Sequence, residues 1–416
     1  ATTFASKEHH QHESTSCADC HMPETTYMVV DPRRDHSLRI PRPDLSVKLG
    51  TPNACNKCHQ DQSPQWAANA VNEWRGSEAP PVAEHFAEAL HRGRVGSPGA
   101  MDALVQSIIS EDQSAIARAT ALVLYSQQGY PGLEYLLAST PNEESTPPLL
   151  SEDALLRLGA TQACAGLQPE LQLRFAVSML ADPIRAIRFE AVRLILPFYP
   201  SMPKDNEVYP LFQKELSAYQ ASLQSTLDQP GTRLNLGLMH NDLQQFDQAE
   251  AEYRAALKLE PHYVPAAINL ADLLRNQDRD VDGEQVLRQA LEFEPGNSDL
   301  LHALGLLQIR TKQLDLALKS LRSAAKAAPR NGRYALVLGV AYESDEQMGN
   351  ARAAYSAGLL SSPWDSDLLL AMFRLNETDG QMAEAKTYAD RLLKSRPDHE
   401  LAKELAAWIE AKMDGK

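Results

Sequence analysis

Two copies of one short cysteine motif carry the clearest chemistry in this chain. Residues 17–21 read CADCH and residues 55–59 read CNKCH, so each is a Cys-x-x-Cys-His sequence. Two thiols at this spacing can form thioethers with the two vinyl groups of one porphyrin, and the next histidine can bind the iron as proximal ligand. The pattern therefore predicts two covalently attached c-type haems per chain. The thioether cysteines would be Cys17, Cys20, Cys55 and Cys58, and the proximal ligands His21 and His59.

Two other interpretations of these four cysteines stay open at this stage. Paired Cys-x-x-Cys sequences can bind zinc, and cysteines can form structural disulfides. Neither explains the histidine that follows the second cysteine in both motifs, and the two pairs stand farther apart than is usual for zinc knuckles. The fifth cysteine, Cys164, lies in a helical pattern of small residues, which favours a buried position in a core.

Histidines are concentrated around the two motifs. Six of the 12 histidines lie in the first 59 residues, and four of the six remain once the proximal ligands are assigned. Because this surplus can close the distal position of both irons, it favours two bis-histidine haems that transfer electrons without binding substrate. We expect His36 to serve one iron and His10 or His12 the other, with His9 as a further candidate. The rival axial ligands are Met22 and Met28.

The linker between the motifs is rich in arginine and proline. Its prolines rule out a long helix and favour extended turns. Guanidinium groups pair well with carboxylates, and each haem carries two propionates. We therefore expect some of these arginines to hold propionates, the alternative being a solvated basic loop. The four candidates are Arg33, Arg34, Arg39 and Arg42.

The whole segment resembles a known family. The run CADCHMPETTYMVVDPRRDHSLRIPRPDLS, followed by GTPNACNKCH, is similar to bacterial multihaem c-type cytochromes with tetratricopeptide repeats, in the part that resembles cytochrome c and c-prime type multihaem domains. The resemblance is specific over residues 9–75. In that family an HHxH segment follows further haem motifs upstream, whereas this chain starts just before it. The resemblance thus implies a two-haem member or the C-terminal part of a larger cytochrome, in which one of His9, His10 and His12 could ligate a haem of another chain.

Composition limits the partners and the location of the protein. Hydrophobic residues make up 43% and charged residues 23% of the 416, which is ordinary for a globular protein, and no apolar run has membrane-spanning length. The net charge of −15 excludes nucleic acid as a natural partner. Since covalent haem attachment takes place in the bacterial cell envelope, the resemblance implies a periplasmic or extracellular protein whose signal sequence was removed before Ala1.

The elements that position these motifs are predicted to be helices. We expect an all-α fold: a small irregular dihaem module in residues 1–80, HEAT-like helical pairs in 81–203, and tetratricopeptide repeats in 204–416. About five repeats cover residues 230–397, and a capping helix follows. Their marker is a proline that recurs at the 34-residue tetratricopeptide period. The recurring prolines are Pro261, Pro295, Pro329, Pro363 and Pro397.

Three hypotheses for function follow. The leading one is a dihaem electron-transfer protein, not an enzyme, whose helical repeats dock a redox partner or further copies of the chain in a multihaem filament. The second is a haem enzyme with one open iron site that reduces a small molecule. The third is a scaffold protein with structural or sensory haems. No catalytic constellation stands out in the repeats, where His240, His262 and His302 are expected to be packed or solvated.

Overall fold

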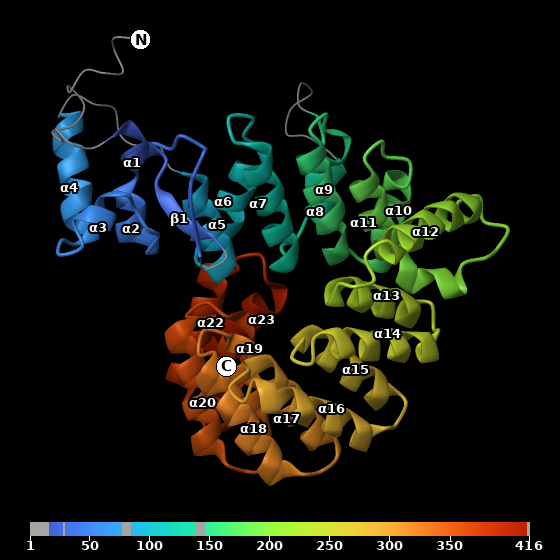
Figure 1. The fold of residues 1–416 in the computed structure, drawn as a ribbon. Coiled ribbons are helices and arrows are strands. Elements are labelled where there is room, and N and C mark those ends of the chain that lie inside the picture. The colour runs from blue at the N-terminus through green and yellow to red at the C-terminus, as the bar shows by residue number, and fades with distance from the viewer. Residues whose placement is uncertain (1–15, 28–29, 77–84, 139–145, 414–416) are drawn as a thin grey trace. The chain divides into compact units, whose positions relative to one another are not determined.

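The computed structural model of the chain describes residues 16–27, 30–76, 85–138 and 146–413. It divides into two compact units, residues 1–91 and 92–416. The described chain is almost entirely helical, as predicted, with one two-stranded hairpin (Figure 1). The division of the second unit into HEAT-like and tetratricopeptide parts stays a prediction at the boundaries given above. No helix in the described part is both long enough and apolar enough to cross a membrane.

The first unit is built from short elements. We call its described residues 16–76 the motif segment. Its helices are short because prolines and glycines interrupt them: Pro43 and Pro64 begin two helices, and Gly50 and Gly76 end them. The elements are α1 (Cys17–His21), β1 (Glu24–Tyr27), β2 (Asp31–Arg34), α2 (Pro43–Leu49), α3 (Cys55–Cys58) and α4 (Pro64–Arg75), and after them α5 (Phe86–Val95) begins.

The hairpin of β1 and β2 folds the linker back onto the first motif. The strands are antiparallel, with Glu24 opposite Arg34 and Tyr27 opposite Asp31. Beyond the hairpin the backbone N–H of Asp35 donates to the carbonyl of Pro23 at 3.2 Å. Arg34, at the end of β2, therefore lies next to α1.

Helical pairs occupy the first part of the second unit. Asp153 caps one of the helices by accepting from the backbone N–H groups of Leu155 and Leu156. Arg157, in the helix that Asp153 caps, forms a buried ion pair with Asp182, which lies just beyond the end of the next helix. The distance between Nε of Arg157 and Oδ2 of Asp182 is 2.7 Å. The helices are α6 (Ala100–Ile109), α7 (Ala115–Gln127), α8 (Leu133–Ala138), α9 (Ala154–Ala163), α10 (Pro169–Met179), α11 (Arg185–Ile195) and α12 (Tyr209–Gln224), with 3₁₀ turns η3 (Pro148–Leu150), η4 (Cys164–Gly166) and η5 (Leu196–Ser201).

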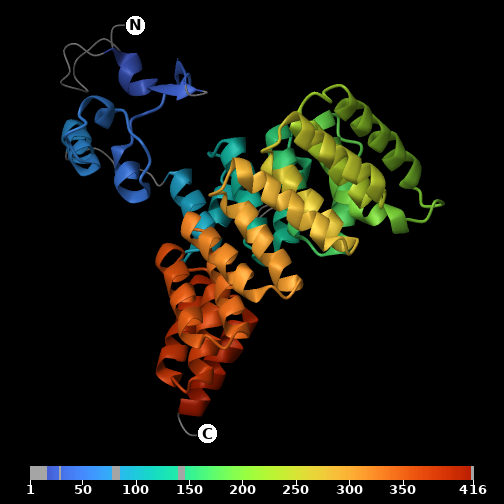
Figure 2. The same ribbon diagram turned by 60° about the horizontal axis from the view of Figure 1, so that its bottom comes forward.

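Five antiparallel helix pairs and a final helix complete the second unit (Figure 2). Each pair packs against the next, and separate clusters of buried apolar residues fill the repeats. The first helices of the pairs are α13 (Pro230–Asp242), α15 (Val264–Asn276), α17 (Ser298–Arg310), α19 (Gly332–Ser344) and α21 (Ser366–Thr378). The second helices are α14 (Phe246–Leu259), α16 (Asp280–Phe293), α18 (Leu314–Ala327), α20 (Met348–Ser361) and α22 (Met382–Ser395), and α23 (Glu400–Met413) follows.

In each pair, one residue of the turn between the two helices has a left-handed backbone conformation. This residue stands at the same position in every repeat. Four of these residues are not glycine, and only the fifth repeat uses Gly380. The turn is fixed because the N–H of the following residue bonds to a carbonyl in the last turn of the first helix, for example Gln313 to Gln308 at 2.8 Å. The four non-glycine residues are Gln244, Asp278, Lys312 and Glu346, with φ between 56° and 60°.

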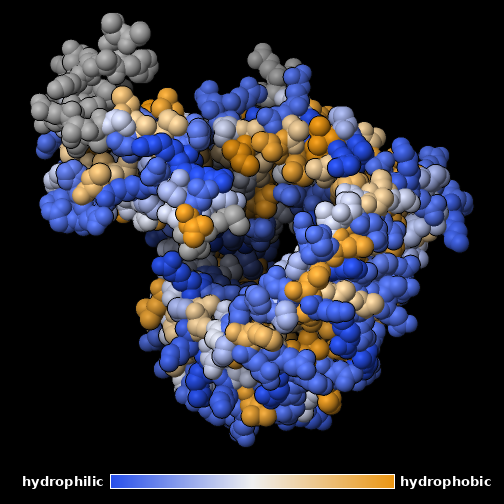
Figure 3. Space-filling model, viewed as in Figure 1, coloured by the Kyte–Doolittle hydropathy of each residue, from blue (hydrophilic) through white to orange (hydrophobic). Residues whose placement is uncertain are grey.

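Glycines inside the repeat helices lie where the helices approach most closely. A Cβ added at Gly339 would lie 2.0 Å from the ring of Tyr355, which is itself fully buried. The core accordingly has no room for a larger side chain there. In contrast, the outer surface over α16 to α20 is mostly hydrophilic, with scattered apolar residues (Figure 3).

The end of the last repeat pair contacts the early helices of the same unit. Arg396 donates from Nη1 to the carbonyl of Gln128 at 3.0 Å and from Nη2 to that of Gly129 at 3.1 Å. Its guanidinium also lies 4.7 Å from the ring centroid of Tyr130. These residues are far apart in sequence, so the contact is tertiary and has no signature in the repeat pattern.

Candidate haem-binding site

The first motif forms a single helical turn. Because Cys17–His21 is the whole of α1, both thiols and the imidazole project from one turn, as a covalent haem requires. Asp19 fixes the start of this turn by accepting from the backbone N–H of Ser16 at 3.0 Å. The Nη2 of Arg34 donates to the same carboxylate at 2.8 Å, and this bond above all holds the pKa of Asp19 below its usual value.

The imidazole of His21 is oriented by the linker. Its Nδ1 lies 2.8 Å from the carbonyl oxygen of Arg39, and the N–H of Arg39 donates to the carbonyl of His21 at 2.8 Å. A carbonyl can only accept, so Nδ1 carries the proton and the lone pair of the neutral ring lies on Nε2. Metal-binding histidines are commonly oriented by such a bond from the second ring nitrogen. The geometry of His21 therefore fits that of a proximal ligand.

The second motif is held by two asparagines that the sequence analysis did not single out. Asn53 donates from Nδ2 to Oδ1 of Asn56 at 2.8 Å and accepts from the Asn56 N–H at 3.0 Å. Asn56, inside the motif, then donates to the carbonyls of His59 and Gln62 at 3.2 and 2.8 Å. These bonds close the loop around α3 on itself. The ring of His59 lies 4.8 Å from that of Trp66, which opens α4.

The two cysteine pairs lie close enough to interact. Burial is the main cause that raises the pKa of Cys20. The negative charges that Cys55, Asp19 and Cys58 can carry raise it further. Burial likewise raises the pKa of Cys55. All five cysteines are free thiols, so the disulfide alternative has no support. Among the residues described, no three His, Cys, Asp or Glu side chains converge in a way that would hold a metal ion, so the residues present do not fit a four-cysteine zinc site.

The motif segment has almost no core of its own. Its buried apolar residues are Pro43, Leu45, Ala67 and Ala68, where α2 packs on α4. Several large apolar side chains are instead exposed, among them Val30 at 81% and Ile40 at 78%. A porphyrin is a large apolar plate, so this distribution fits a segment folded around bound cofactors. The other exposed apolar side chains are Tyr27, Leu38, Val47 and Trp66.

Each of the four linker arginines pairs with an aspartate of the chain. Arg42 and Asp44 are joined by two hydrogen bonds, since the carboxylate accepts from Nε and Nη2 at 2.8 Å each. This bond raises the pKa of Arg42 and lowers that of Asp44. The remaining pairs are Arg33 with Asp31, Arg34 with Asp19 and Arg39 with Asp35. Arg33 and Arg39 are the most exposed of the four, so these two are the best placed to exchange their aspartates for a propionate.

The predicted distal ligands are only partly described. His36 is exposed beside the hairpin, whereas His9, His10, His12 and Met28 lie outside the described residues. Met22 is half-buried at the end of α1. The sequence analysis gave no role to His85, which precedes α5. Burial, followed by the positive charge of Arg42, lowers the pKa of this half-buried imidazole, so His85 is a further neutral histidine of the first unit.

The prediction for Cys164 is confirmed. Its side chain is fully buried, and its Sγ lies 3.3 Å from the carbonyl of Ala160. Burial raises the pKa of the thiol to about 12. A thiol that stays protonated and shielded is a poor nucleophile and a poor metal ligand. Cys164 therefore belongs to the packing of the second unit.

Models of two known families match separate parts of the chain. Residues 3–89 match the family model described as Cytochrome c552. Residues 234–298 and 302–364 match the tetratricopeptide repeat model. The chain thus joins a cytochrome c region to repeats of a type that generally mediates protein–protein interaction.

Curated relatives and solved structures match smaller shares of the chain. Cellulose synthase operon protein C of Pseudomonas fluorescens is 31% identical over 180 residues, which are 39% of this chain and 14% of that protein. A TPR repeat-containing protein of Pseudomonas aeruginosa is 27% identical over 188 residues, 44% of this chain and 30% of that protein. The chain therefore spans less than a third of the length of either relative. The crystal structure of PilW, a type IV pilus biogenesis factor, covers 51% of this chain and 98% of its own at 18% identity and a TM-score of 0.38. That of YrrB covers 45% and 96% at 18% identity and a TM-score of 0.34.

Proposed function

We propose that this chain is an electron-transfer cytochrome that carries two c-type haems and uses its repeats to bind a protein partner. The observation that carries the proposal is the geometry of His21: the first motif forms one helical turn whose imidazole is held through Nδ1 by the carbonyl of Arg39. With the proton on Nδ1, Nε2 is the ring nitrogen that can ligate an iron ion. The match of residues 3–89 to a cytochrome family supports the same conclusion.

The chain's residues have distinct roles in this proposal. When bound, each haem supplies a reversible one-electron centre. Cys17 and Cys20 anchor one group and Cys55 and Cys58 the other, while Asn56 fixes the loop that carries the second pair. Because Cys20 interacts with the second pair, the two groups would lie near each other, as electron transfer between them requires. His21 and His59 are the proposed proximal ligands.

The distal ligands and propionate partners belong to the same proposal. We assign one distal position to His36 and the other to His10 or His12, with His9 as a further candidate, so that both irons are bis-histidine. Arg39 and Arg33, which are 71% and 64% exposed, are the first candidates for the propionates, followed by Arg34 and Arg42. If both irons are closed in this way, neither binds substrate, and the protein is not an enzyme.

The repeats would supply the docking surface. Their polar outer face and the net charge of −15 would steer a basic redox partner or prevent nonspecific association. Further copies of the chain are the alternative occupants, which would join haem to haem in an oligomer or filament. Because covalent haem attachment takes place in the cell envelope, we place the protein in the periplasm or at the cell surface.

A pyridine haemochrome assay, combined with low-temperature spin-resonance spectroscopy of the oxidised protein, tests the proposal. We expect two covalent haems per chain, both low-spin. A high-spin signal that cyanide converts to low-spin would replace the electron carrier with a small-molecule reductase. Absence of covalent haem would overturn the proposal altogether. Normal electron transfer in cells after deletion of both motifs, with partner binding retained, would favour the scaffold hypothesis.

A further inference from the structure

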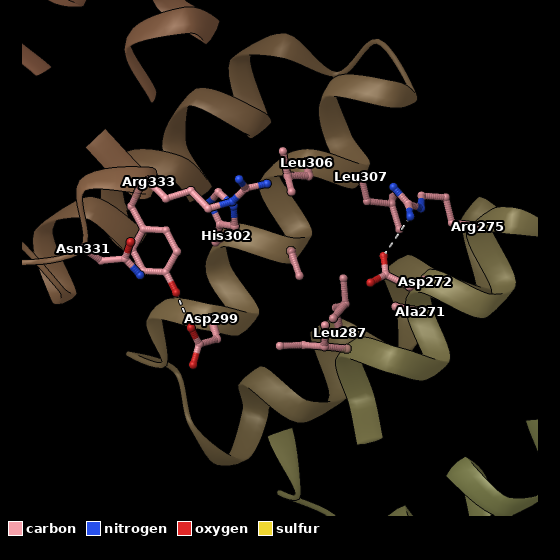
Figure 4. A pocket seen from close by; sticks show the side chains of 13 residues that line it. Ala271, Asp272, Arg275, Leu287, Asp299, His302, Leu306, Leu307, Asn331 and Arg333 are labelled. Atoms are coloured by element: carbon pink, nitrogen blue, oxygen red, sulfur yellow. Dashed lines mark hydrogen bonds and ion pairs between the residues drawn. The ribbon is translucent and has the colours of Figure 1, made fainter. Parts of the chain in front are cut away.

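A cavity lies among the first helices of three successive repeats. It encloses about 350 Å³. Residues of α15, α16, α17 and α19 line it, and apolar side chains form its middle (Figure 4). One end carries His302, Arg333, Asn331 and Asp299, and the other carries Asp272 with Arg275. The cavity is therefore an apolar cleft with a polar group of residues at either end.

His302 is an unusual residue for the wall of such a cavity. It is only 8% exposed, and neither of its ring nitrogens has a hydrogen-bond partner among the described residues. Its ring packs on Tyr334 with 4.6 Å between centroids. Burial, and after it the positive charge of Arg333, lowers the pKa of His302, so the ring is neutral at pH 7 and offers one donor and one acceptor. A buried polar group without a partner costs free energy that a bound ligand can recover.

The charged side chains that line the cavity differ in whether they have a hydrogen-bond or ion-pair partner. Asp299 accepts the hydroxyl of Tyr334, and Asp272 lies 3.3 Å from Nη2 of Arg275. Both carboxylates thus have a partner within the wall. Arg333 is exposed and forms no ion pair or hydrogen bond within the described chain. The end of the cavity that holds His302 therefore has one guanidinium without a hydrogen-bond partner and one unused imidazole donor, beside the Asp299 carboxylate that the Tyr334 hydroxyl engages.

We propose that this cavity binds a glutamate side chain of the partner polypeptide, with the carboxylate between Arg333 and His302. The inference rests on the proposed docking role of the repeats and names the chemistry that they recognise. Two methylene groups suit the apolar middle formed by Leu306 and Leu307, and they let the carboxylate reach a recessed ring. A chain terminus would have to bring its backbone to the same depth, past Asp299.

The test measures binding of three blocked or free peptides to the full haem-containing chain by calorimetry. The probes are acetyl-Ala-Leu-Glu-Leu-Ala-amide, its glutamine analogue, and acetyl-Ala-Leu-Gln with a free carboxyl end. We expect the glutamate peptide to bind about tenfold more tightly than its analogue, as one charge-assisted bond allows. It should also raise the pKa of His302 in an imidazole NMR titration, because a nearby carboxylate favours the charged ring.

Matched variants decide whether the cavity is responsible. R333Q should abolish the preference for glutamate, and H302F should reduce it. R330Q removes an exposed positive charge three residues away that does not line the cavity, and should change nothing. Equal binding of the glutamate and glutamine peptides, an equal loss in R330Q, or a preference for the free carboxyl end would each overturn the inference. H302F is checked for folding by circular dichroism, and R333Q tests the proposal even if H302F unfolds.

The haem assay on the same samples separates the two proposals. If the peptides fail to discriminate while two low-spin haems are present, only the glutamate site is wrong. If haem is absent, the electron-transfer proposal fails regardless of what the cavity binds.

Discussion

The motif segment and the repeats differ in how far they bury their large apolar side chains. In the repeats Tyr253 and Tyr355 are almost completely buried, and glycines let helices close around them. In the motif segment Val30 and Ile40 are largely exposed, and the buried apolar residues are Pro43, Leu45 and two alanines. A segment with so little core cannot offset the entropy of ordering its backbone by packing alone. We therefore expect the repeats to fold by themselves and the motif segment to depend on what binds to it.

Removing the haem attachment sites should have the largest effect. We expect the quadruple variant C17S/C20S/C55S/C58S to lose covalent haem, and amide exchange across residues 16–76 to become close to that of an unfolded chain. Exchange in α13 to α22 should stay unchanged. Hydrogen exchange with mass spectrometry measures both parts in one sample.

Cys164→Ala is the matched control for those substitutions. It removes a buried thiol from the second unit, so it should leave haem content unchanged and destabilise the helical pairs by about 1 kcal/mol. The dependence of the motif segment on haem would be disproved by full amide protection of residues 16–76 in the haem-free protein.

The ion pairs of the two regions should differ nearly as much. Arg157 and Asp182 pair in a buried setting, with 12% and 4% of their side chains exposed, so Arg157→Ala should cost about 3 kcal/mol or more by leaving a buried charge unpaired. Arg33 and Asp31 pair in the open, and Arg33→Ala should cost less than about 1 kcal/mol. Urea unfolding followed by circular dichroism measures both. Similar losses of unfolding free energy in the two variants would contradict the predicted difference between the ion pairs of the two regions.

Overpacking the repeat core should cost somewhat less. Gly339→Ala places a Cβ against the buried ring of Tyr355 and should destabilise the repeats by about 2 kcal/mol. Gly349→Ala, also in a repeat helix but with nothing within 4 Å, should be neutral or slightly stabilising. The difference in melting temperature between the two variants is the measurement. Neither substitution should alter the haem spectrum, and a spectral change in Gly339→Ala would contradict the independence of the two regions.

The contact between the last repeat and the early helices should be weaker still. Arg396→Ala removes two bonds to backbone carbonyls and the contact with Tyr130, and should cost about 1–2 kcal/mol. Amide exchange should then rise around residues 128–130. Lys394→Ala, which removes a charge from the last turn of α22 but none of these bonds, serves as control. Unchanged exchange in Arg396→Ala would mean that the contact contributes nothing to stability.

The smallest expected effect is on the pH dependence of stability. Burial alone would raise the pKa of Asp182, but bonds from Arg157 and the N–H of Ile184 outweigh it and leave the pKa below its usual value. A depressed folded pKa means that this stabilisation is complete above the unfolded pKa and disappears as the pH falls through the folded one. Thermal melts between pH 6 and 3 should therefore show a loss below about pH 4 that is smaller in Asp182→Asn. An identical slope in both proteins would contradict this.

Much of the fold could be predicted because it repeats. Prolines at a 34-residue period mark the five helix pairs, and the structure has five pairs there. The left-handed turns were not predictable in the same way, since Gln244 and Lys312 carry no conformational signal comparable to glycine. Hydrogen bonds to the end of the first helix impose their conformation, so only the folded pair reveals it.

The candidate site divides in the same manner. The spacing of Cys17, Cys20 and His21 within one helical turn is a local property, and the sequence by itself determined that these residues can attach one haem. Only the tertiary structure decided which carbonyl orients His21, that Asn56 closes the second loop, and that His302 is left buried without a partner. Those arrangements depend on residues brought together by turns and packing over long distances in the chain. The spacing of residues in the sequence determines which side chains one helical turn can present. The contacts between elements determine which groups those side chains lie next to.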